Sequence, residues 1–385
     1  MHERTVGEAC EYVYCRPLKF ELMNIPLHVT KSFLPPQEEY VARLATIWKT
    51  GQLTNNGQLV QLLEKRLCER LQIDRCLLVS NGDAGLQLSI RALKLNGEVI
   101  TTPFSYISTL SSLLWLGLQP VFVDIDSERL TIDPTKIEQA ITSRTSAILV
   151  THVYGRPCDV VAIEAIAKRY DLRVIYDAAH AFAVDYLNQP LPKSGDISMI
   201  SLHATKLFHT GEGGLLVAND PELHEQVEWH RRFGHRGNDA FHGVGINAKM
   251  SELHAAMGLC VLDHMDGIIE HRRKTCEAYR ERLFTAEDRV QLLAPVTGAT
   301  ENHAYFPVLF SSEKHLLRAM RIMRKEEIYP RRYFFPALHR AFPNLTGEHS
   351  LPVAESIAER VLCLPLSHGT SEFDIERVAA AVLGR

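Results

Sequence analysis

Residues 173–206 read RVIYDAAHAFAVDYLNQPLPKSGDISMISLHATK, and they contain two short apolar runs, Val174–Asp177 and Ile197–Leu202. Both runs are only a few residues long and are bounded by polar segments, which is typical of buried β-strands. An ionisable side chain follows each run closely: Asp177 closes the first, and Lys206 comes after the second. Ligands of parallel sheets bind beyond the carboxyl ends of the strands, so both side chains are candidates for a functional site.

The same alternation extends in both directions from this stretch. Between Cys76 and Asp220, short β-rich runs alternate with helical patterns. This spacing predicts an α/β fold with a mostly parallel, helix-covered sheet of seven strands. The other five predicted strands are Cys76–Ser80, Val99–Thr102, Val121–Asp124, Ala147–His152 and Gly214–Val217. The predicted helices are Ala84–Leu95, Ile107–Leu116, Pro134–Ile141 and Val160–Arg169.

Beyond Met250 the pattern becomes helical and then mixed. The predicted elements are a helical segment from Ser251 to about Arg282, a strand at Tyr305–Phe310, a helix at His315–Lys325, an aromatic loop at Pro330–Pro343 and a helix at Phe373–Leu383. We predict a large α/β domain over residues 23–264 and a smaller α+β domain over residues 265–385. Residues 1–22 are predicted to be an N-terminal extension outside both.

Composition narrows the class of protein. The chain has 385 residues, of which 46% are apolar, enough to bury a full core, and its net charge is −4. No basic cluster favours nucleic acid or an anionic membrane as a partner, and apolar runs such as Leu113–Leu118 are far shorter than the ~20 residues that span a bilayer. Residues 1–22 lack the apolar core of a secretory signal, and the eight cysteines form no C-x-x-C pair. These features predict a cytoplasmic protein without disulfides or a zinc site.

The first strand ends in a glycine turn, Ser80–Gly85, that opens a helix. Unpaired backbone N–H groups and the positive end of the helix dipole bind phosphate at such a turn. The residues placed to do so are Gly82, Asp83 and Ala84, although the turn taken alone favours the interpretation of Asp83 as a helix cap. Neither of the common glycine-rich nucleotide motifs is present, which argues against a dinucleotide or P-loop site.

Asp177 and Lys206 have several possible roles when each is taken alone. A carboxylate at a strand end can pair with a protonated ring nitrogen, hold a metal or cap a helix. Lys206 lies between a strand and the turn Gly211–Gly214, and burial there would lower its pKa and favour the free amine that condenses with a carbonyl.

The combination is more specific than its parts. Pyridoxal 5′-phosphate (PLP) needs a phosphate-binding turn, an acid for its ring nitrogen and a lysine for its aldehyde. Tyr106, after the second strand, adds an aromatic face that can stack on the ring. The sequence therefore predicts a PLP site.

Eight segments together resemble the DegT/DnrJ/StrS family of sugar aminotransferases, over the chain from about residue 25 to its end. They are Asn55–Gly57, Ser80–Leu86, Thr102–Tyr106, Pro120–Asp126, Asp177–Ala181, Ser201–Lys206, Gly211–Gly214 and Gly245–Glu252. Within the family, the chain most resembles the enzymes that form dTDP-4-amino-4,6-dideoxy-D-glucose from dTDP-4-dehydro-6-deoxy-D-glucose.

The resemblance implies a fold-type-I PLP enzyme with Lys206 and Asp177 as catalytic residues. Lys206 would hold the cofactor covalently and move protons, and Asp177 would pair with the pyridine nitrogen. The other implied cofactor contacts are Gly82, Asp83, Ala84, Tyr106, His180, Ser201 and Asn247. Since Asn247 would reach the phosphate from the neighbouring subunit, the resemblance also implies a homodimer with shared sites.

The implied substrates are L-glutamate and a nucleotide sugar, favoured as dTDP-linked. Residues placed to contact the sugar nucleotide are Asn55, Arg231, Arg236 and Tyr333, whereas a solvated basic turn and small-domain packing would explain the last three equally well. Amination of a 3-keto sugar and a UDP-linked substrate stay open as alternatives.

One residue departs from the family pattern, because Asp83 stands where Thr or Ser is usual. A carboxylate near a dianionic phosphate is repulsive, so we expect Asp83→Thr to tighten PLP binding.

The three alternative functions are a dehydratase of the same family, a non-catalytic PLP-fold regulator and a metal protein. A dehydratase of the same family would have histidine in place of Lys206, and a non-catalytic PLP-fold regulator would not need the whole set. A metal protein is prompted by 18 histidines, but no H-E-x-x-H spacing supports it. The histidines concerned are His203, His209, His230, His235 and His242.

Overall fold

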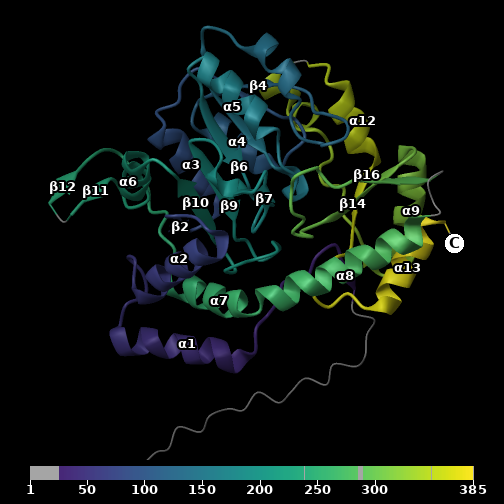
Figure 1. Ribbon diagram of the computed structural model, residues 1–385, viewed down its shortest axis with the longest axis horizontal. Helices are drawn as coiled ribbons and strands as arrows, with labels where there is room; N and C mark the ends of the chain where they lie inside the picture. The colour runs from purple at the N-terminus through teal and green to yellow at the C-terminus, as the bar shows by residue number, and fades with distance from the viewer. Residues whose placement is uncertain (1–25, 238, 285–288, 348, 385) are drawn as a thin grey trace, which may run out of the picture.

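A seven-stranded sheet forms the centre of the computed structural model, which describes residues 26–237, 239–284, 289–347 and 349–384 (Figure 1). The strand order is β2-β10-β9-β6-β5-β3-β4, and only β10 runs antiparallel to its neighbours. The strands are β2 (Leu77–Val79), β3 (Glu98–Thr101), β4 (Gln119–Phe122), β5 (Thr145–Thr151), β6 (Arg173–Asp177), β9 (Ile197–Ser201) and β10 (Gly214–Ala218). The predicted mostly parallel sheet is thus confirmed, with one strand from each predicted run.

Both faces of the sheet are buried under helices, as expected for parallel strands. Successive residues of β6 point to opposite faces: Val174 and Tyr176 pack with α2, α5 and α7, and Ile175 packs with α3 and α6. The helices over the first face are α2 (Gln58–Leu71), α5 (Val160–Arg169) and α7 (Glu252–Asp263). Those over the second face are α3 (Gly82–Ala92), α4 (Ile107–Trp115) and α6 (Pro221–His230). Farther out, α1 (Gln37–Thr50) packs on α7.

The predicted helix at Pro134–Ile141 is wrong in type. The segment forms two successive 3-10 turns, Pro134–Lys136 and Glu138–Ala140, and Ile141 is already extended. Bonds between residues three apart suit such a short connection better than an α-helix, which needs more residues to complete its bonds. The Asp133 side chain caps the first turn by accepting from the Thr135 N–H.

The C-terminal part of the chain forms a second core. In Figure 1, α8 (Met265–Leu283) runs from the side of α7 to α13 (Glu372–Val382). Its first turns pack with the main core through Ile268, and its last turns pack in the second core through Tyr279. The second core also contains a three-stranded antiparallel sheet and a further helix. These are β13 (Val290–Leu292), β14 (Phe306–Phe310), β16 (Val361–Leu364) and α9 (Glu313–Lys325). Beside this core, α12 (Pro352–Arg360) packs through Ile357 in a separate cluster that also contains Phe104 and Phe122.

The remaining elements are short. They are β1 (Leu27–His28), β7 (Asp185–Tyr186), β8 (Gln189–Pro190), β11 (His235–Arg236), β12 (Ala240–Phe241), β15 (Ile328–Tyr329), α10 (Leu338–Ala341), α11 (Pro343–Thr346) and 3-10 turns at Val153–Gly155 and Leu191–Lys193. β1 pairs with β15, so the start of the predicted large domain lies against the second core. The domain boundary at residue 265 stays a prediction, and the extension over residues 1–22 lies outside the described residues. None of the described helices is both long and apolar enough to cross a membrane.

Candidate active site

A cavity of about 520 Å³ lies beyond the carboxyl ends of β2, β3, β5, β6 and β9, all of which run in the same direction. The structure brings together in its wall the predicted residues Gly82, Asp83, Tyr106, Asp177, His180, Ser201, Lys206 and Tyr333. Five other predicted site residues do not line this cavity: Ala84, Asn247, Asn55, Arg231 and Arg236.

The turn after β2 presents backbone amides to the cavity. Asn81 is the N-cap of α3, and its Oδ1 accepts from the Ala84 N–H at 2.8 Å. The interpretation of Asp83 as the cap is therefore wrong, and the Ala84 amide is already occupied. Gly82 and Asp83 are the first two residues of the helix, so their N–H groups have no partner within it and are the amides suited to a phosphate.

Hydrogen bonds hold the Asp83 carboxylate between two helices. Its Oδ1 accepts from Ser108 Oγ on α4 and its Oδ2 from Gln87 Nε2 on α3, both at 2.6 Å. These donors offset part of the repulsion that the carboxylate would exert on a phosphate at the same turn.

Asp177 is almost completely buried at the end of β6. Its Oδ2 accepts from Thr109 Oγ1 at 2.7 Å and its Oδ1 from the Ala179 N–H at 3.1 Å. Burial raises the pKa of this carboxyl, while the two hydrogen bonds and the charge of Lys206 act in the opposite direction. A buried carboxylate on a cavity wall is suited to a positively charged ring nitrogen.

Lys206 lies in the turn after β9, where its N–H donates to the His203 carbonyl at 2.8 Å. The side chain is half-buried and lines the cavity. Burial lowers the pKa of its amine, and the Asp177 carboxylate opposes that shift. A lowered pKa increases the fraction of free amine, the form that reacts with an aldehyde.

The surroundings of His180 keep its ring neutral and make it a hydrogen-bond donor. Its Nδ1 accepts from the Tyr154 N–H at 3.0 Å, which places the imidazole proton on Nε2. Burial, with the nearby Lys206, lowers the pKa of the ring well below its ordinary value. The ring also packs against Tyr305 with 4.6 Å between centroids and lies parallel to Phe334. Nε2 is thus fixed as the donor nitrogen.

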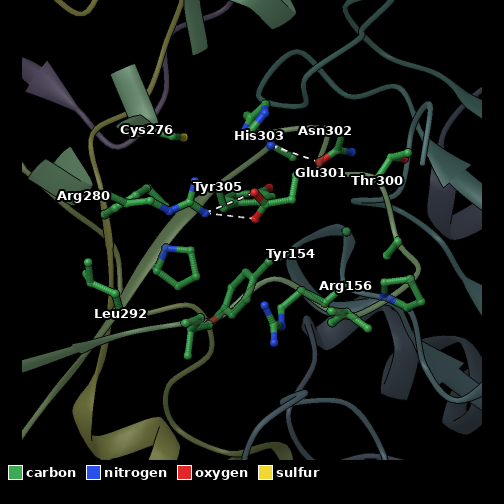
Figure 2. A pocket seen from close by; sticks show the side chains of 18 residues that line it. Tyr154, Arg156, Cys276, Arg280, Leu292, Thr300, Glu301, Asn302, His303 and Tyr305 are labelled. Carbon is green, nitrogen blue, oxygen red and sulfur yellow. Dashed lines mark hydrogen bonds and ion pairs between the residues drawn. The ribbon is translucent and has the colours of Figure 1, made fainter. Parts of the chain in front are cut away.

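A second, smaller cavity lies behind this wall (Figure 2). Tyr305 lines both cavities, and Asn302 beside it donates from Nδ2 to the carbonyls of His180 and Phe182, both at 2.9 Å. Figure 2 also shows the ion pair of Arg280 with Glu301, at 3.0 Å. With a volume of about 60 Å³, this space has room for a few water molecules but not for a sugar nucleotide. Asn302 and Tyr305 therefore hold His180 in position from the side of the smaller cavity.

Tyr106 and Tyr333 occupy the open side of the cavity. Tyr106 is 55% exposed at the N-terminus of α4, and its ring centroid is 6.5 Å from that of Phe334. Tyr333 is half-buried, and burial raises the pKa of its hydroxyl. Both aromatic faces are placed to meet a planar ring or a sugar.

Arg231 makes its hydrogen bonds inside the subunit, and its predicted contact with a diphosphate stays a prediction. Arg231 is 4% exposed, and its Nη1 donates to Glu64 Oε1 at 3.0 Å and to the Leu78 carbonyl at 2.7 Å. These acceptors take the donors of Nη1 inside the subunit.

The other predicted substrate residues lie away from the site of this subunit. Asn55 borders a separate cavity of about 460 Å³ between α2 and α6. Arg236 is exposed on the β11–β12 hairpin, which projects from the body in Figure 1, and its guanidinium lies 5.6 Å from the Trp229 ring. Asn247 is also exposed, and its Oδ1 accepts from Lys249 Nζ.

Several supporting residues were not predicted from the sequence. Asn81 stands before the glycine turn, where an asparagine is a recognisable helix cap. Thr109, Tyr154, Asn302 and Tyr305 carry no such local signal, because their partners Asp177 and His180 lie 26 to 125 positions away in the chain.

Within the described ranges, no group of three or more His, Cys, Asp or Glu side chains could hold a metal ion.

This site fits PLP group by group. The amides of Gly82 and Asp83 suit its phosphate, Asp177 its ring nitrogen, His180 Nε2 its phenolic oxygen and Lys206 its aldehyde. A mostly parallel seven-stranded sheet that presents this set beyond its strand ends defines a fold-type-I PLP-dependent aminotransferase.

Comparison with known proteins identifies the family. The model of the DegT/DnrJ/EryC1/StrS aminotransferase family matches residues 36–383. The chain belongs to this family of PLP-dependent sugar aminotransferases, which confirms the resemblance, the class of enzyme and the cofactor.

Individual relatives agree with this assignment. A Shigella dysenteriae protein named dTDP-4-amino-4,6-dideoxy-D-glucose transaminase is 41% identical over 364 residues, covering 94% of this chain and 99% of the relative. The structure of DesI in the presence of its TDP-sugar product has a TM-score of 0.89 at 33% identity, covering 94% of this chain and 93% of that chain. The structure of NtdA from Bacillus subtilis with bound cofactor PMP has a TM-score of 0.83 at 26% identity, covering 90% and 81%.

Proposed function

We propose that this enzyme transfers the amino group of L-glutamate to C4 of dTDP-4-dehydro-6-deoxy-D-glucose, forming dTDP-4-amino-4,6-dideoxy-D-glucose. The site geometry supports the transfer, because Lys206, Asp177 and the turn at Gly82 and Asp83 line the same cavity. The sugar is supported by the 41% identical relative, whose name specifies this product, and by the TDP-sugar in the DesI structure.

The residues of the chain act on the reaction in distinct ways. PLP, when bound, supplies an electron sink that makes the α-carbon of an amino acid acidic. Asp177 keeps the ring nitrogen protonated, because a buried carboxylate strongly prefers a cationic partner. Lys206, as a free amine after the donor has displaced it, accepts the proton from the α-carbon of glutamate. His180 donates from Nε2, and the Gly82 and Asp83 amides hold the phosphate in place.

The second half of the transfer uses the same residues in the opposite direction. 2-Oxoglutarate leaves, the keto sugar enters the cavity, and Lys206 delivers a proton to C4 of the sugar. Tyr106 would stack on the cofactor ring, and Tyr333 would contact the sugar on the open side of the cavity.

We further propose a cytoplasmic homodimer with shared active sites. Asn247 and Arg236 are exposed and lie outside the wall of the cavity of their own subunit, which supports a role in the site of a partner. A two-fold interface would give both sites the same composition.

The experiment that tests the proposed function follows the cofactor by absorbance. Purified enzyme should be yellow, and adding L-glutamate should shift its absorbance and release 2-oxoglutarate. The shifted enzyme should then return to its first spectrum with the dTDP-linked 4-keto sugar, and much more slowly with the 3-keto isomer or the UDP-linked sugar. A protein that binds PLP but shows no spectral change with glutamate would be a regulator rather than an enzyme.

A further inference from the structure

Arg331 adds a second cationic side chain, besides Lys206, to the wall of the active-site cavity. Its side chain is exposed, and its guanidinium carbon lies 5.6 Å from the centroid of the Tyr333 ring. Among the described residues that line this cavity, Arg331 is the one arginine and Lys206 the one lysine. Since Lys206 reacts with the cofactor aldehyde, Arg331 is the remaining permanent cation for a substrate.

The backbone of Arg331 is anchored at a defined position. Its N–H donates to the Cys363 carbonyl at 3.3 Å, and the Cys363 N–H donates back to the Arg331 carbonyl at 2.8 Å. Cys363 lies in β16 and is completely buried. The backbone of Arg331 is therefore fixed at the wall of the cavity, and its guanidinium lies against the Tyr333 ring in a cation–π contact.

The adjacent arginine shows what a structural role looks like here. Arg332 Nη2 donates to Glu313 Oε1 at 2.8 Å and to the Glu359 carbonyl at 2.9 Å, and its guanidinium stacks on Phe335. Arg331 makes no side-chain hydrogen bond or ion pair with any residue in the part of the chain that the structure describes. The donors of the Arg331 guanidinium therefore have no partner among the described residues and can bind a ligand of the cavity.

We propose that Arg331 is a specificity-determining residue that binds anionic oxygen atoms of the substrates. This proposal rests on the proposed function and extends it to one side chain. L-Glutamate brings carboxylates and the nucleotide sugar brings a diphosphate, and the planar fork of a guanidinium binds either group through two parallel hydrogen bonds. A lysine keeps the charge but not the fork.

The experiment compares Arg331→Gln and Arg331→Lys with the wild-type holoenzyme. Arg340→Gln is the matched control, because Arg340 is also exposed and charged but pairs with Glu355 at 2.9 Å and does not line the cavity. Two half-reactions are measured separately by absorbance: the PLP form with L-glutamate, and the PMP form with the dTDP-linked keto sugar. PLP affinity and the thermal midpoint are measured for each variant.

We expect Arg331→Gln to raise the half-saturating concentration by about tenfold or more in at least one half-reaction. PLP affinity and the thermal midpoint should stay at wild-type values, and Arg331→Lys should restore part of the loss. An effect on the glutamate half-reaction alone identifies the carboxylate as the ligand, and an effect on the sugar half-reaction alone identifies the diphosphate. Half-saturation within about twofold of wild type in both, or an equal change in Arg340→Gln, would overturn the proposal.

Measurements on the wild-type enzyme distinguish failure of the proposed function from failure of the proposed role of Arg331. If it reacts with glutamate but not with the sugar, the proposed sugar is wrong, and the glutamate half-reaction still decides the role of Arg331. If it reacts with both substrates and Arg331→Gln has no effect, only the role of Arg331 fails.

Discussion

Burial has opposite effects on the pKa values of Asp177 and Lys206, and both effects suit the proposed chemistry. It raises the pKa of the Asp177 carboxyl and lowers the pKa of the Lys206 amine, because a low-polarity environment disfavours either charge. A cationic ring nitrogen would therefore stabilise the Asp177 carboxylate, and the free amine of Lys206 can react with an aldehyde. PLP provides both groups in one molecule.

Replacement of Asp177 tests its role at the ring nitrogen. We expect Asp177→Ala to lower the rate of the glutamate half-reaction by about 100-fold or more, because the ring would lose the proton that makes it an electron sink. PLP should stay bound through Lys206 and the phosphate turn, which an absorbance spectrum can verify. A near-normal single-turnover rate with bound PLP would remove Asp177 from the mechanism.

The lowered pKa of Lys206 predicts a pH dependence for cofactor attachment. The rate at which the apoprotein attaches PLP should rise with pH as the amine loses its proton, with a midpoint below the ordinary lysine value of 10.5. Asp177→Asn should move that midpoint lower still, because the Asp177 carboxylate raises the pKa of the amine. Stopped-flow absorbance over a pH series measures both midpoints. An upward shift in Asp177→Asn would contradict this electrostatic coupling.

From the family resemblance, we predict Thr or Ser at the position of Asp83. We expect Asp83→Thr to tighten PLP binding, since the substitution removes a negative charge beside the phosphate turn and keeps a hydroxyl within reach of Ser108. Spectral titration of the apoprotein gives the dissociation constant. Affinity equal to or weaker than that of the wild type would show that Ser108 and Gln87 already neutralise the effect of the carboxylate.

At the scale of elements, one ion pair holds in place the strand that leads into the phosphate turn. Glu64 on α2 accepts from the Leu78 N–H on β2 at 2.9 Å and from Arg231, directly after α6. The pair thus joins three elements at the strand that leads into the phosphate turn.

We expect Arg231→Met to lower the free energy of unfolding by about 3 kcal/mol or more, because Glu64 would keep a buried charge without its partner. Adding Glu64→Leu should restore much of that loss. Urea unfolding measures both variants, and Arg236→Met is an exposed control that should change stability by less than about 0.5 kcal/mol. If Arg231→Met leaves stability intact and instead weakens sugar binding, the substrate role predicted from the sequence would be supported.

The strands and the main site residues could be predicted because their signals are local. Seven apolar runs and the residues directly after them, such as Asp177 and Lys206, carry their information within a few positions. The internal contacts of Arg231 could not be predicted, because its partner Glu64 lies 167 positions earlier, where no local pattern indicates contact. The Asn302 contacts with His180 and Phe182 span 122 and 120 positions and were invisible for the same reason. The 3-10 turns at Pro134–Lys136 and Glu138–Ala140 have a composition that also suits an α-helix. The composition therefore did not indicate that the segment forms two short 3-10 turns.

At the scale of the whole molecule, attraction for a phosphorylated substrate has to be local. The net charge is −4, so no long-range field draws in an anion, and the phosphate turn and a few cations must bind it. If partner subunits contribute some of these groups, activity depends on assembly.

Hybrid dimers test whether sites are shared. Lys206→Ala and Asn247→Ala should each be nearly inactive alone, and mixing them under subunit exchange should recover activity. In the hybrid, one site has Lys206 from one subunit and Asn247 from the other. No recovery, with exchange verified by mass spectrometry, would place Asn247 in the site of its own subunit, and full activity of Asn247→Ala alone would place it outside any site.

The most direct test of the central claim is to determine the structure of the product by NMR after the enzyme has acted on L-glutamate and dTDP-4-dehydro-6-deoxy-D-glucose. The predicted result is dTDP-4-amino-4,6-dideoxy-D-glucose, with nitrogen on C4 in the gluco configuration and one 2-oxoglutarate released per product. Recovery of unchanged keto sugar, or of a product with nitrogen on another carbon, would contradict the account.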